Sequence, residues 1–213
     1  MPQRTPAQRL AYDAFRLMAR LIGVWFFRLR VAGREHWPVD GGALVCANHQ
    51  SHFDPPLVGL TCRRRMNYLA RDTLFRLPVL GQLIGFFDAI PIDREGIGLG
   101  GLKETLRRLK AGELVLIFPE GTRTSDGEIA PLKPGFISVA RRSRVPLIPI
   151  AMDGAYQSWP RSAPLPGLGR VAIVIGPPIM PDDLTNFTDE DLLAELEQRL
   201  LTCHATAREM RTR

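Results

Sequence analysis

The chain of 213 residues is long enough for one domain with a hydrophobic core, and its content of 45% hydrophobic and 23% charged residues is that of an ordinary globular protein. Its formal net charge of +6 favours an anionic partner: a membrane surface, a nucleic acid or a phosphorylated substrate. The three cysteines, Cys46, Cys62 and Cys203, are odd in number and form no Cys-x-x-Cys pair. This argues against a disulfide framework or a zinc knuckle and fits a reducing compartment.

The first predicted element is a basic amphipathic helix over residues 8–30. Its arginines are interleaved with aromatic and aliphatic residues, among them Trp25, Phe26 and Phe27. Trp and Phe beside cations are typical of a helix that lies in the interface of an anionic membrane. The alternative is a first helix that packs on the core and exposes its arginines. The longest apolar stretch, residues 17–27, is shorter than the ~20 residues of a membrane span, so we expect no transmembrane helix.

The rest of the chain alternates short apolar runs with amphipathic segments. Strands are predicted at residues 43–47, 66–70, 89–92, 114–118, 146–152 and 171–175, and helices at 55–61, 99–109, 135–142 and after Thr188. Residues 74–87 are interpreted as a buried helix pair, or as a surface that dips into lipid or lines an acyl channel. The alternation predicts a single α/β domain over residues 33–213, with a mostly parallel sheet covered by helices. Residues 1–32 would form an N-terminal amphipathic helical membrane-binding segment.

A histidine and an aspartate five residues apart follow the first predicted strand. His49 lies in the loop after that strand, and Asp54 stands before two prolines, where it is predicted to be the N-cap of a helix. A carboxylate near an imidazole holds one ring N–H and makes the other nitrogen a better base for a hydroxyl group. The alternative is that Asp54 is only a cap and His49 only a polar loop residue. We interpret His52 as a supporting or surface group.

A second motif, Glu120-Gly121-Thr122-Arg123, follows another predicted strand. The glycine allows the backbone to turn, and the planar guanidinium of Arg123 suits a phosphate. The alternative is a surface turn with a Glu120–Arg123 ion pair. Arg94 also follows a strand and could add positive charge, unless it only pairs with Asp93. Ligands of α/β sheets bind beyond the carboxyl ends of the strands, so these residues could share a pocket suited to acylating a phosphate-bearing alcohol.

These motifs resemble those of the lysophospholipid acyltransferase family. Its first motif, Asn-His-x-Ser-x-x-Asp, is matched by Asn48, His49, Ser51 and Asp54. Its third, Phe-Pro-Glu-Gly-Thr-Arg-Ser, is matched by residues 118–123, with Thr124 in place of serine. Residues 89–94 and 145–149 resemble its second and fourth motifs, and the similarity extends in order over residues 33–176. A lysine that is frequent in the family appears here as Arg71.

The resemblance implies an acyltransferase that forms no covalent acyl-enzyme. His49 would be the general base on the free hydroxyl of a lysophospholipid, by default 1-acylglycerol-3-phosphate giving phosphatidate, and Asp54 would orient His49. The implied substrate-binding residues are Glu120, Gly121, Thr122, Arg123, Arg94 and Arg71. The acyl donor would be acyl-CoA or acyl carrier protein, as a substrate, and no cofactor is expected. The four histidines show no ligand spacing with the cysteines, so no metal is expected either.

The implied partners are the lysophospholipid, the acyl thioester and the anionic lipids of a membrane surface. The protein would be peripheral or monotopic on the cytoplasmic face of a membrane. No nucleic acid is expected, because the arginines are scattered among apolar residues and no recognised binding motif is present. Three alternatives remain open: an acyltransferase for another lysolipid, a thioesterase, and a non-catalytic protein that binds anionic lipid at a membrane surface.

Overall fold

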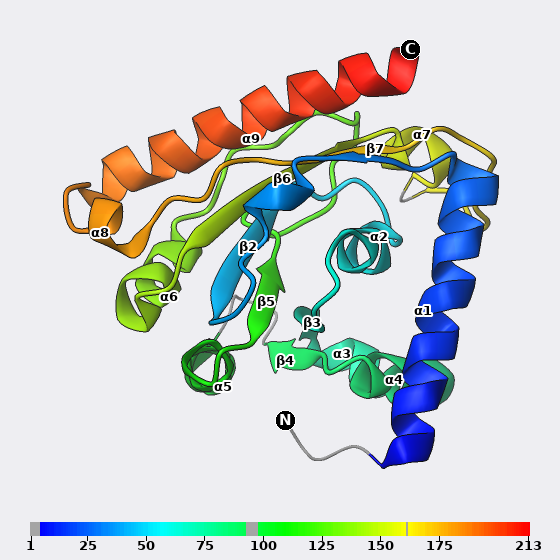
Figure 1. Ribbon diagram of the computed structural model, residues 1–213, viewed down its shortest axis with the longest axis horizontal. Coiled ribbons are helices and arrows are strands. Elements are labelled where there is room, and N and C mark those ends of the chain that lie inside the picture. The colour runs from blue at the N-terminus through cyan, green and yellow to red at the C-terminus, as the bar shows by residue number, and fades with distance from the viewer. Residues whose placement is uncertain (1–4, 93–97, 161) are drawn as a thin grey trace.

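The computed structural model describes residues 5–92, 98–160 and 162–213. Within them, seven strands form one sheet in the order β1-β7-β6-β2-β5-β3-β4 (Figure 1). The strands are β1 (Arg30–Ala32), β2 (Ala43–Ala47), β3 (Met66–Arg71), β4 (Ile90–Ile92), β5 (Leu114–Ile117), β6 (Leu147–Asp153) and β7 (Ala172–Ile175). Neighbouring strands from β6 to β4 are parallel, β7 is antiparallel to β6, and β1 is parallel to β7. The predicted α/β fold with a mostly parallel sheet is confirmed.

Helices cover both faces of this sheet. The helices are α1 (Pro6–Phe27), α2 (Asp54–Thr61), α3 (Asp72–Phe75), α4 (Pro78–Phe86), α5 (Gly98–Lys110), α6 (Gly135–Ser143), α7 (Ala155–Ser158), α8 (Pro181–Leu184), α9 (Asp189–Thr212) and the 3₁₀ helix η1 (Arg34–His36). Alternate residues of the central strands point to opposite faces, so Leu44 joins one apolar cluster and Val45 the other. Burial on both faces explains why these strands are continuously apolar in sequence.

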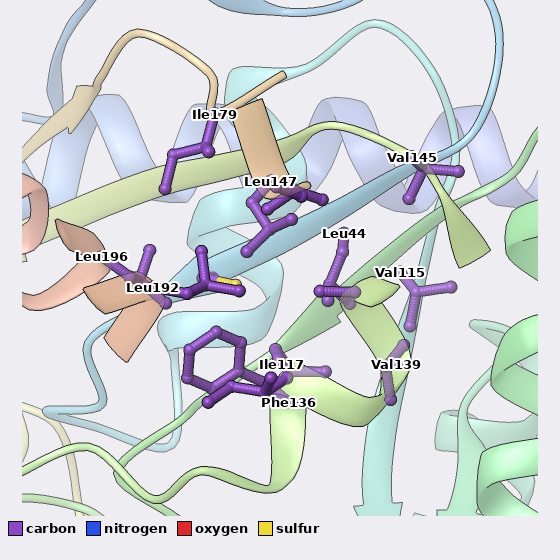
Figure 2. Packing of buried hydrophobic residues seen from close by; sticks show 14 of the residues in the cluster. Leu44, Val115, Ile117, Phe136, Val139, Val145, Leu147, Ile179, Leu192 and Leu196 are labelled. Carbon is purple, nitrogen blue, oxygen red and sulfur yellow. The ribbon is translucent and has the colours of Figure 1, made fainter. Parts of the chain in front are cut away.

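The cluster around Leu44 lies between the sheet and helices α5, α6 and α9. Figure 2 shows part of it, including Leu44, Val115, Ile117 and Leu147 from the strands, Phe136 and Val139 from α6, and Leu192 and Leu196 from α9. The opposite face is covered by α2, α7 and the end of α1, through residues such as Leu57, Ala155 and Phe27. Both clusters are buried, and together they hold the central strands β2, β5 and β6 rigidly in register.

The predicted strands and long helices agree with the structure to within one or two residues at each end, except that α1 ends at Phe27, three residues before the predicted end. The Thr188 side chain accepts a hydrogen bond from the Asp191 backbone N–H, as expected for a capping box, and α9 begins there. Strand β1 and the short helices η1, α7 and α8 were not predicted, because segments of three or four residues carry no periodic signal. Since β1 pairs with β7, the sheet begins at Arg30, inside the range 1–32 assigned to the membrane segment.

Helix α1 lies at the side of the domain with one apolar face uncovered (Figure 1). Its rings contact the end of α4: Tyr12 and Phe15 lie about 6 Å from Phe86 and Phe87 between centroids. Phe27 is buried at the other end of the helix. Its exposed apolar residues are Leu10, Phe15, Leu17, Met18, Leu21, Ile22, Val24, Trp25 and Phe26. None of the helices in the described part of the chain is long and apolar enough to cross a membrane.

Candidate active site

The loops that follow β2 and β5 lie side by side at the carboxyl edge of the sheet (Figure 1). Cys46 pairs with Ile117, so His49 and Glu120 each stand three residues beyond a matched pair. The backbone N–H of His49 donates to Glu120 Oε1 at 2.7 Å, and the His49 carbonyl accepts from the Thr124 N–H at 2.8 Å. Both main-chain groups of His49 are therefore held by the loop that follows β5.

The side chain of His49 is oriented by Asp54. The distance from His49 Nδ1 to Asp54 Oδ2 is 2.6 Å, and the same oxygen accepts from the backbone N–H groups of Gln50 (2.5 Å) and Ser51 (2.7 Å). The imidazole stacks on the Phe118 ring, with centroids 3.9 Å apart and an interplanar angle of 15°. The Asp54 side chain is fully buried, whereas that of His49 is 20% exposed. This geometry holds Nδ1 against the carboxylate and leaves Nε2 as the nitrogen that can take a proton.

The prediction that Asp54 is the N-cap of α2 is wrong. Phe53 occupies the cap position without a side-chain hydrogen bond, and Asp54 is the first residue of the helix. The carboxylate turns back toward the chain before the helix, because the N–H groups of Gln50 and Ser51 and the ring of His49 all lie on that side. Asp54 therefore organises the loop of residues 48–54, called the catalytic loop below for its predicted role, rather than the helix.

Glu120 is almost fully buried between the two loops. Its Oε1 accepts from the His49 N–H and its Oε2 from the Ala130 N–H at 2.9 Å. Both oxygens are thus used by the main chain, so the alternative of a Glu120–Arg123 ion pair does not describe this turn. Burial raises the pKa of the Glu120 carboxyl to about 7; the negative charges of Asp54 and Asp126 add to this rise, and the two N–H groups oppose it.

Arg123 extends from the same loop toward the catalytic loop, where its guanidinium contacts His52 Nε2. The His52 ring lies 5.2 Å from that of Trp159. Gly121 has φ +72°, the left-handed conformation that favours glycine, and it turns the chain between Glu120 and Arg123. The exposed Thr122 lies in this turn. The structure therefore brings the predicted residues 49, 54 and 120–123 into two contacting loops.

The other two predicted cations lie further along the sheet or outside the described part of the chain. Arg71 is exposed at the carboxyl end of β3, which pairs with β5, and it is the residue before α3. The carboxyl ends of β2, β5 and β3 share one edge, so Arg71 lies at the same edge of the sheet as the loop that carries His49. Arg94 falls within residues 93–97 and lies outside the described residues.

Comparison with known proteins bears on this site. A family model described as "Acyltransferase" matches residues 28–153 of the chain, which include both loops. The chain belongs to this acyltransferase family.

The names of similar proteins agree with membership of the acyltransferase family. The chain is 31% identical to the 1-acyl-sn-glycerol-3-phosphate acyltransferase of Bacillus subtilis, over 81% of this chain and 84% of the relative. It is 30% identical to the enzyme of that name from Limnanthes douglasii, over 79% of this chain and 62% of the relative. The crystal structure of PlsC, the 1-acyl-sn-glycerophosphate acyltransferase of Thermotoga maritima, matches with a TM-score of 0.81 and 26% identity, covering all of this chain and 85% of that one.

Two further residues of the sequence motifs, for which the sequence predicted no role, support the site. Asn48 donates from Nδ2 to the Met152 carbonyl at 3.0 Å and accepts the Met152 N–H on Oδ1 at 2.8 Å, which ties the catalytic loop to β6. Phe118 supplies the surface on which His49 stacks. Their places in the motifs were the only signal, since the contacts depend on strands and loops that are distant in sequence.

An apolar cavity of about 360 Å³ lies beside the catalytic loop. Its lining comes from the end of α1, from the catalytic loop and from the loop before β7: Ile22, Phe26, Phe27, Phe53, Pro166, Gly167 and Leu168. Phe53 lines the cavity and directly precedes Asp54 in the chain, so one wall of the cavity belongs to the loop that holds the His49–Asp54 pair. Such an arrangement can place a long apolar chain close to a base.

The raised pKa of Glu120 predicts a pH dependence of stability. The folded state keeps its proton up to about pH 7, while the unfolded chain ionises from its ordinary value of 4.5, so the free energy of unfolding should fall as pH rises from 4.5 to 7. Glu120→Gln lacks this titration and leaves one buried N–H without an acceptor. Denaturant unfolding should show that the free energy of unfolding of wild type exceeds that of the variant most at pH 4.5 or below. This difference in free energy should shrink by up to about 3 kcal/mol by pH 7. A constant difference would contradict the assignment.

Proposed function

We propose that the chain is a 1-acyl-sn-glycerol-3-phosphate acyltransferase, which transfers a fatty acyl group from a thioester to the free hydroxyl of a lysophospholipid. With lysophosphatidate as the acceptor, the product is phosphatidate. The observation that carries the proposal is the His49–Asp54 pair, held by four hydrogen bonds and a ring stack at the carboxyl edge of the sheet. Membership of the acyltransferase family and the names of the relatives support it.

The geometry suits general-base catalysis of direct acyl transfer. His49 Nε2 takes the proton of the acceptor hydroxyl, whose oxygen attacks the carbonyl carbon of the thioester. The C–S bond then breaks, and the thiolate leaves with the proton that the imidazolium returns. Asp54 stabilises the transient imidazolium, because its Oδ2 already faces Nδ1 at 2.6 Å. A thioester is already activated, so the chemistry as proposed uses acyl-CoA or acyl carrier protein as a substrate and needs no cofactor or metal.

The phosphate of the acceptor is assigned to Arg123. Its guanidinium lies against His52 in the catalytic loop, so an anion bound to it would be near His49. Gly121 and Thr122 shape the turn that carries it, and Glu120 holds that turn to His49. Arg71, the last residue of β3, would provide further positive charge at the same edge. Arg94, which lies outside the described residues, keeps its predicted part in acceptor binding.

The apolar cavity is assigned to part of an acyl chain. Its lining is aromatic and aliphatic, and it opens between the catalytic loop and the end of α1. A chain leaving a bilayer beside α1 would reach the cavity without crossing polar surface. This location supports a lipid substrate over a small water-soluble alcohol, and it favours acyl transfer over simple lipid binding because Phe53, which lines the cavity, directly precedes Asp54 in the chain.

The protein is further proposed to bind a membrane as a peripheral or monotopic protein, on the cytoplasmic face and with anionic lipids as partners. The uncovered apolar face of α1 supports this, together with the arginines that flank it. The exposed Leu77, Val79 and Leu83 lie on α4 or at its start, and α4 contacts α1 through Phe86, so they would extend the same surface. Residues 1–32 would serve as the main membrane-binding segment.

The proposal is tested by incubating the full chain with labelled acyl-CoA or acylated carrier protein and a panel of lysolipids, with the products identified by mass spectrometry. Phosphatidate formed from lysophosphatidate is the expected result. Transfer only to a different lysolipid would change the acceptor and keep the reaction. Release of free fatty acid alone would indicate a thioesterase, and binding without any product would indicate a non-catalytic lipid-binding protein.

Changes to the catalytic pair should remove activity without unfolding the protein. His49→Ala should lower kcat by about 10²–10⁴-fold, the usual contribution of general-base catalysis. Asp54→Asn should lower kcat at least about tenfold, because a neutral amide stabilises the imidazolium less well. Steady-state kinetics and circular dichroism check both variants, with Asp40→Asn at an exposed position as a control expected to behave like wild type. Near-normal turnover of His49→Ala would refute the assignment of the base.

Arg123→Lys should weaken acceptor binding, because lysine cannot hold two phosphate oxygens with one planar group. We expect the KM for lysophosphatidate to rise and the corresponding kcat/KM to fall about ten- to a hundredfold, with the KM for the thioester nearly unchanged. Arg107→Lys, on the exposed side of α5, is the matched control. A change confined to the thioester KM would move Arg123 to the donor site.

Membrane binding should depend on the exposed face of α1. Leu17, Leu21 and Trp25 are spaced four residues apart and are 59%, 51% and 77% exposed, so changing all three to Ser should leave the fold intact and remove a large part of the apolar area that α1 offers to lipid. Flotation with anionic liposomes should show reduced binding for this triple variant, and high salt should weaken wild-type binding. The control changes the exposed Val39, Leu99 and Leu201 to Ser. Equal flotation of all three proteins would shift the lipid-binding role to residues 74–87.

A further inference from the structure

One buried histidine takes no part in the chemistry described above. His204 lies on α9, which crosses β6 and β7 on the face opposite α2 (Figure 1), and only 4% of the residue is exposed. Its Nε2 faces two groups: Gln50 Nε2 at 3.4 Å and Asp153 Oδ1 at 3.5 Å. Gln50 belongs to the catalytic loop, so this histidine joins the C-terminal helix to the loop that carries the base.

The side chain of Gln50 is fully buried, and each of its polar atoms faces a partner. Oε1 accepts from the backbone N–H groups of Ala155 (3.1 Å) and Tyr156 (3.2 Å) at the start of α7. Nε2 donates to the Gly127 carbonyl at 2.7 Å. Its second hydrogen is left for His204 Nε2, which can accept it when that ring nitrogen carries no proton.

Asp153 also faces His204 Nε2, but the two make no hydrogen bond: among the described residues, the buried Asp153 Oδ1 has no hydrogen-bond partner. Asp153 pairs with Arg211 and lies 3.6 Å from Arg208 Nε, and Arg208 also pairs with Glu128 at 2.6 Å. The charge of Asp153 is thus met by guanidinium groups, and the hydrogen bond that His204 Nε2 makes is the one with Gln50.

Gln50 is also in direct contact with the catalytic pair. Its backbone N–H donates to Asp54 Oδ2 at 2.5 Å, and that oxygen lies 2.6 Å from His49 Nδ1. A shift of the Gln50 side chain would move this N–H and so rotate the carboxylate that orients the imidazole. Misplacing a catalytic group by about 1 Å can cost about a hundredfold in rate.

We propose that His204 is a positioning residue for the catalytic base: with its proton on Nδ1, it accepts a hydrogen bond from Gln50 and thereby fixes the catalytic loop. The inference rests on the proposed function only in naming the reaction that the loop supports. His204 touches no reacting atom, and its effect is expected on kcat rather than on substrate binding.

The kinetic test compares two substitutions that differ in one hydrogen bond. His204→Leu fills the site without an acceptor and should lower kcat for lysophosphatidate about ten- to a hundredfold, with both KM values within about twofold of wild type. His204→Gln offers an amide oxygen to Gln50 and an NH₂ group to Asp153, and it should recover most of the rate. Thr206→Ala, exposed on the same helix and bonded only to the Thr202 carbonyl, should match wild type. Equal losses in the Leu and Gln variants, or none in either, would overturn the proposal.

A second measurement does not depend on activity. Nitrogen-15 NMR of the full chain labelled at histidine should show the proton of His204 on Nδ1, and His204→Leu should shift or broaden the Nδ1–H resonance of His49, whereas Thr206→Ala should not. A proton on His204 Nε2 would mean that the ring donates to Asp153, and the proposal would be wrong. If wild type acylates no lysolipid, the proposed function fails, and the NMR result still decides the contact between α9 and the catalytic loop.

Discussion

The parallel pairing of β2 with β5 is the constraint on which the site depends. Two adjacent parallel strands must end at the same edge, so the loops that follow them meet there. In this chain the register puts His49 beside Glu120, and the buried carboxylate binds the His49 main chain and Ala130 at once. His49, the proposed base, is thereby attached to the loop that carries Arg123, the proposed anion-binding group.

Around this junction three polar side chains of the catalytic loop are buried and form hydrogen bonds. Asn48, Gln50 and Asp54 are each at most 1% exposed, and they bind β6, α7 and the loop itself. A buried polar group without partners would cost free energy, so these contacts make other loop conformations unfavourable. The site is therefore organised before substrate arrives, which is the condition for efficient catalysis by positioning.

The apolar surfaces of the chain divide into two kinds. Those of β2, β5, α6 and α9 form the closed core, whereas the outer face of α1 and parts of α4 stay uncovered. An uncovered apolar face along a helix calls for a partner that covers it. The cavity beside Phe53 lies where α1 meets the catalytic loop, so the surface proposed to bind lipid and the His49–Asp54 pair are neighbours in the fold.

The sequence by itself determined the α/β class, most strand and helix positions, and the two motifs, because these depend on local periodicity and on residue types at short spacing. It could not determine that Asp54 turns away from its own helix, that Glu120 binds the main chain rather than Arg123, or that β1 joins the sheet. Each of these depends on which donors and strands lie nearby in space. The contacts of Phe118, Gln50 and His204 were likewise decided only by tertiary structure, since the partners of a buried side chain can be far away in sequence, as Gln50 and His204 are at a separation of 154.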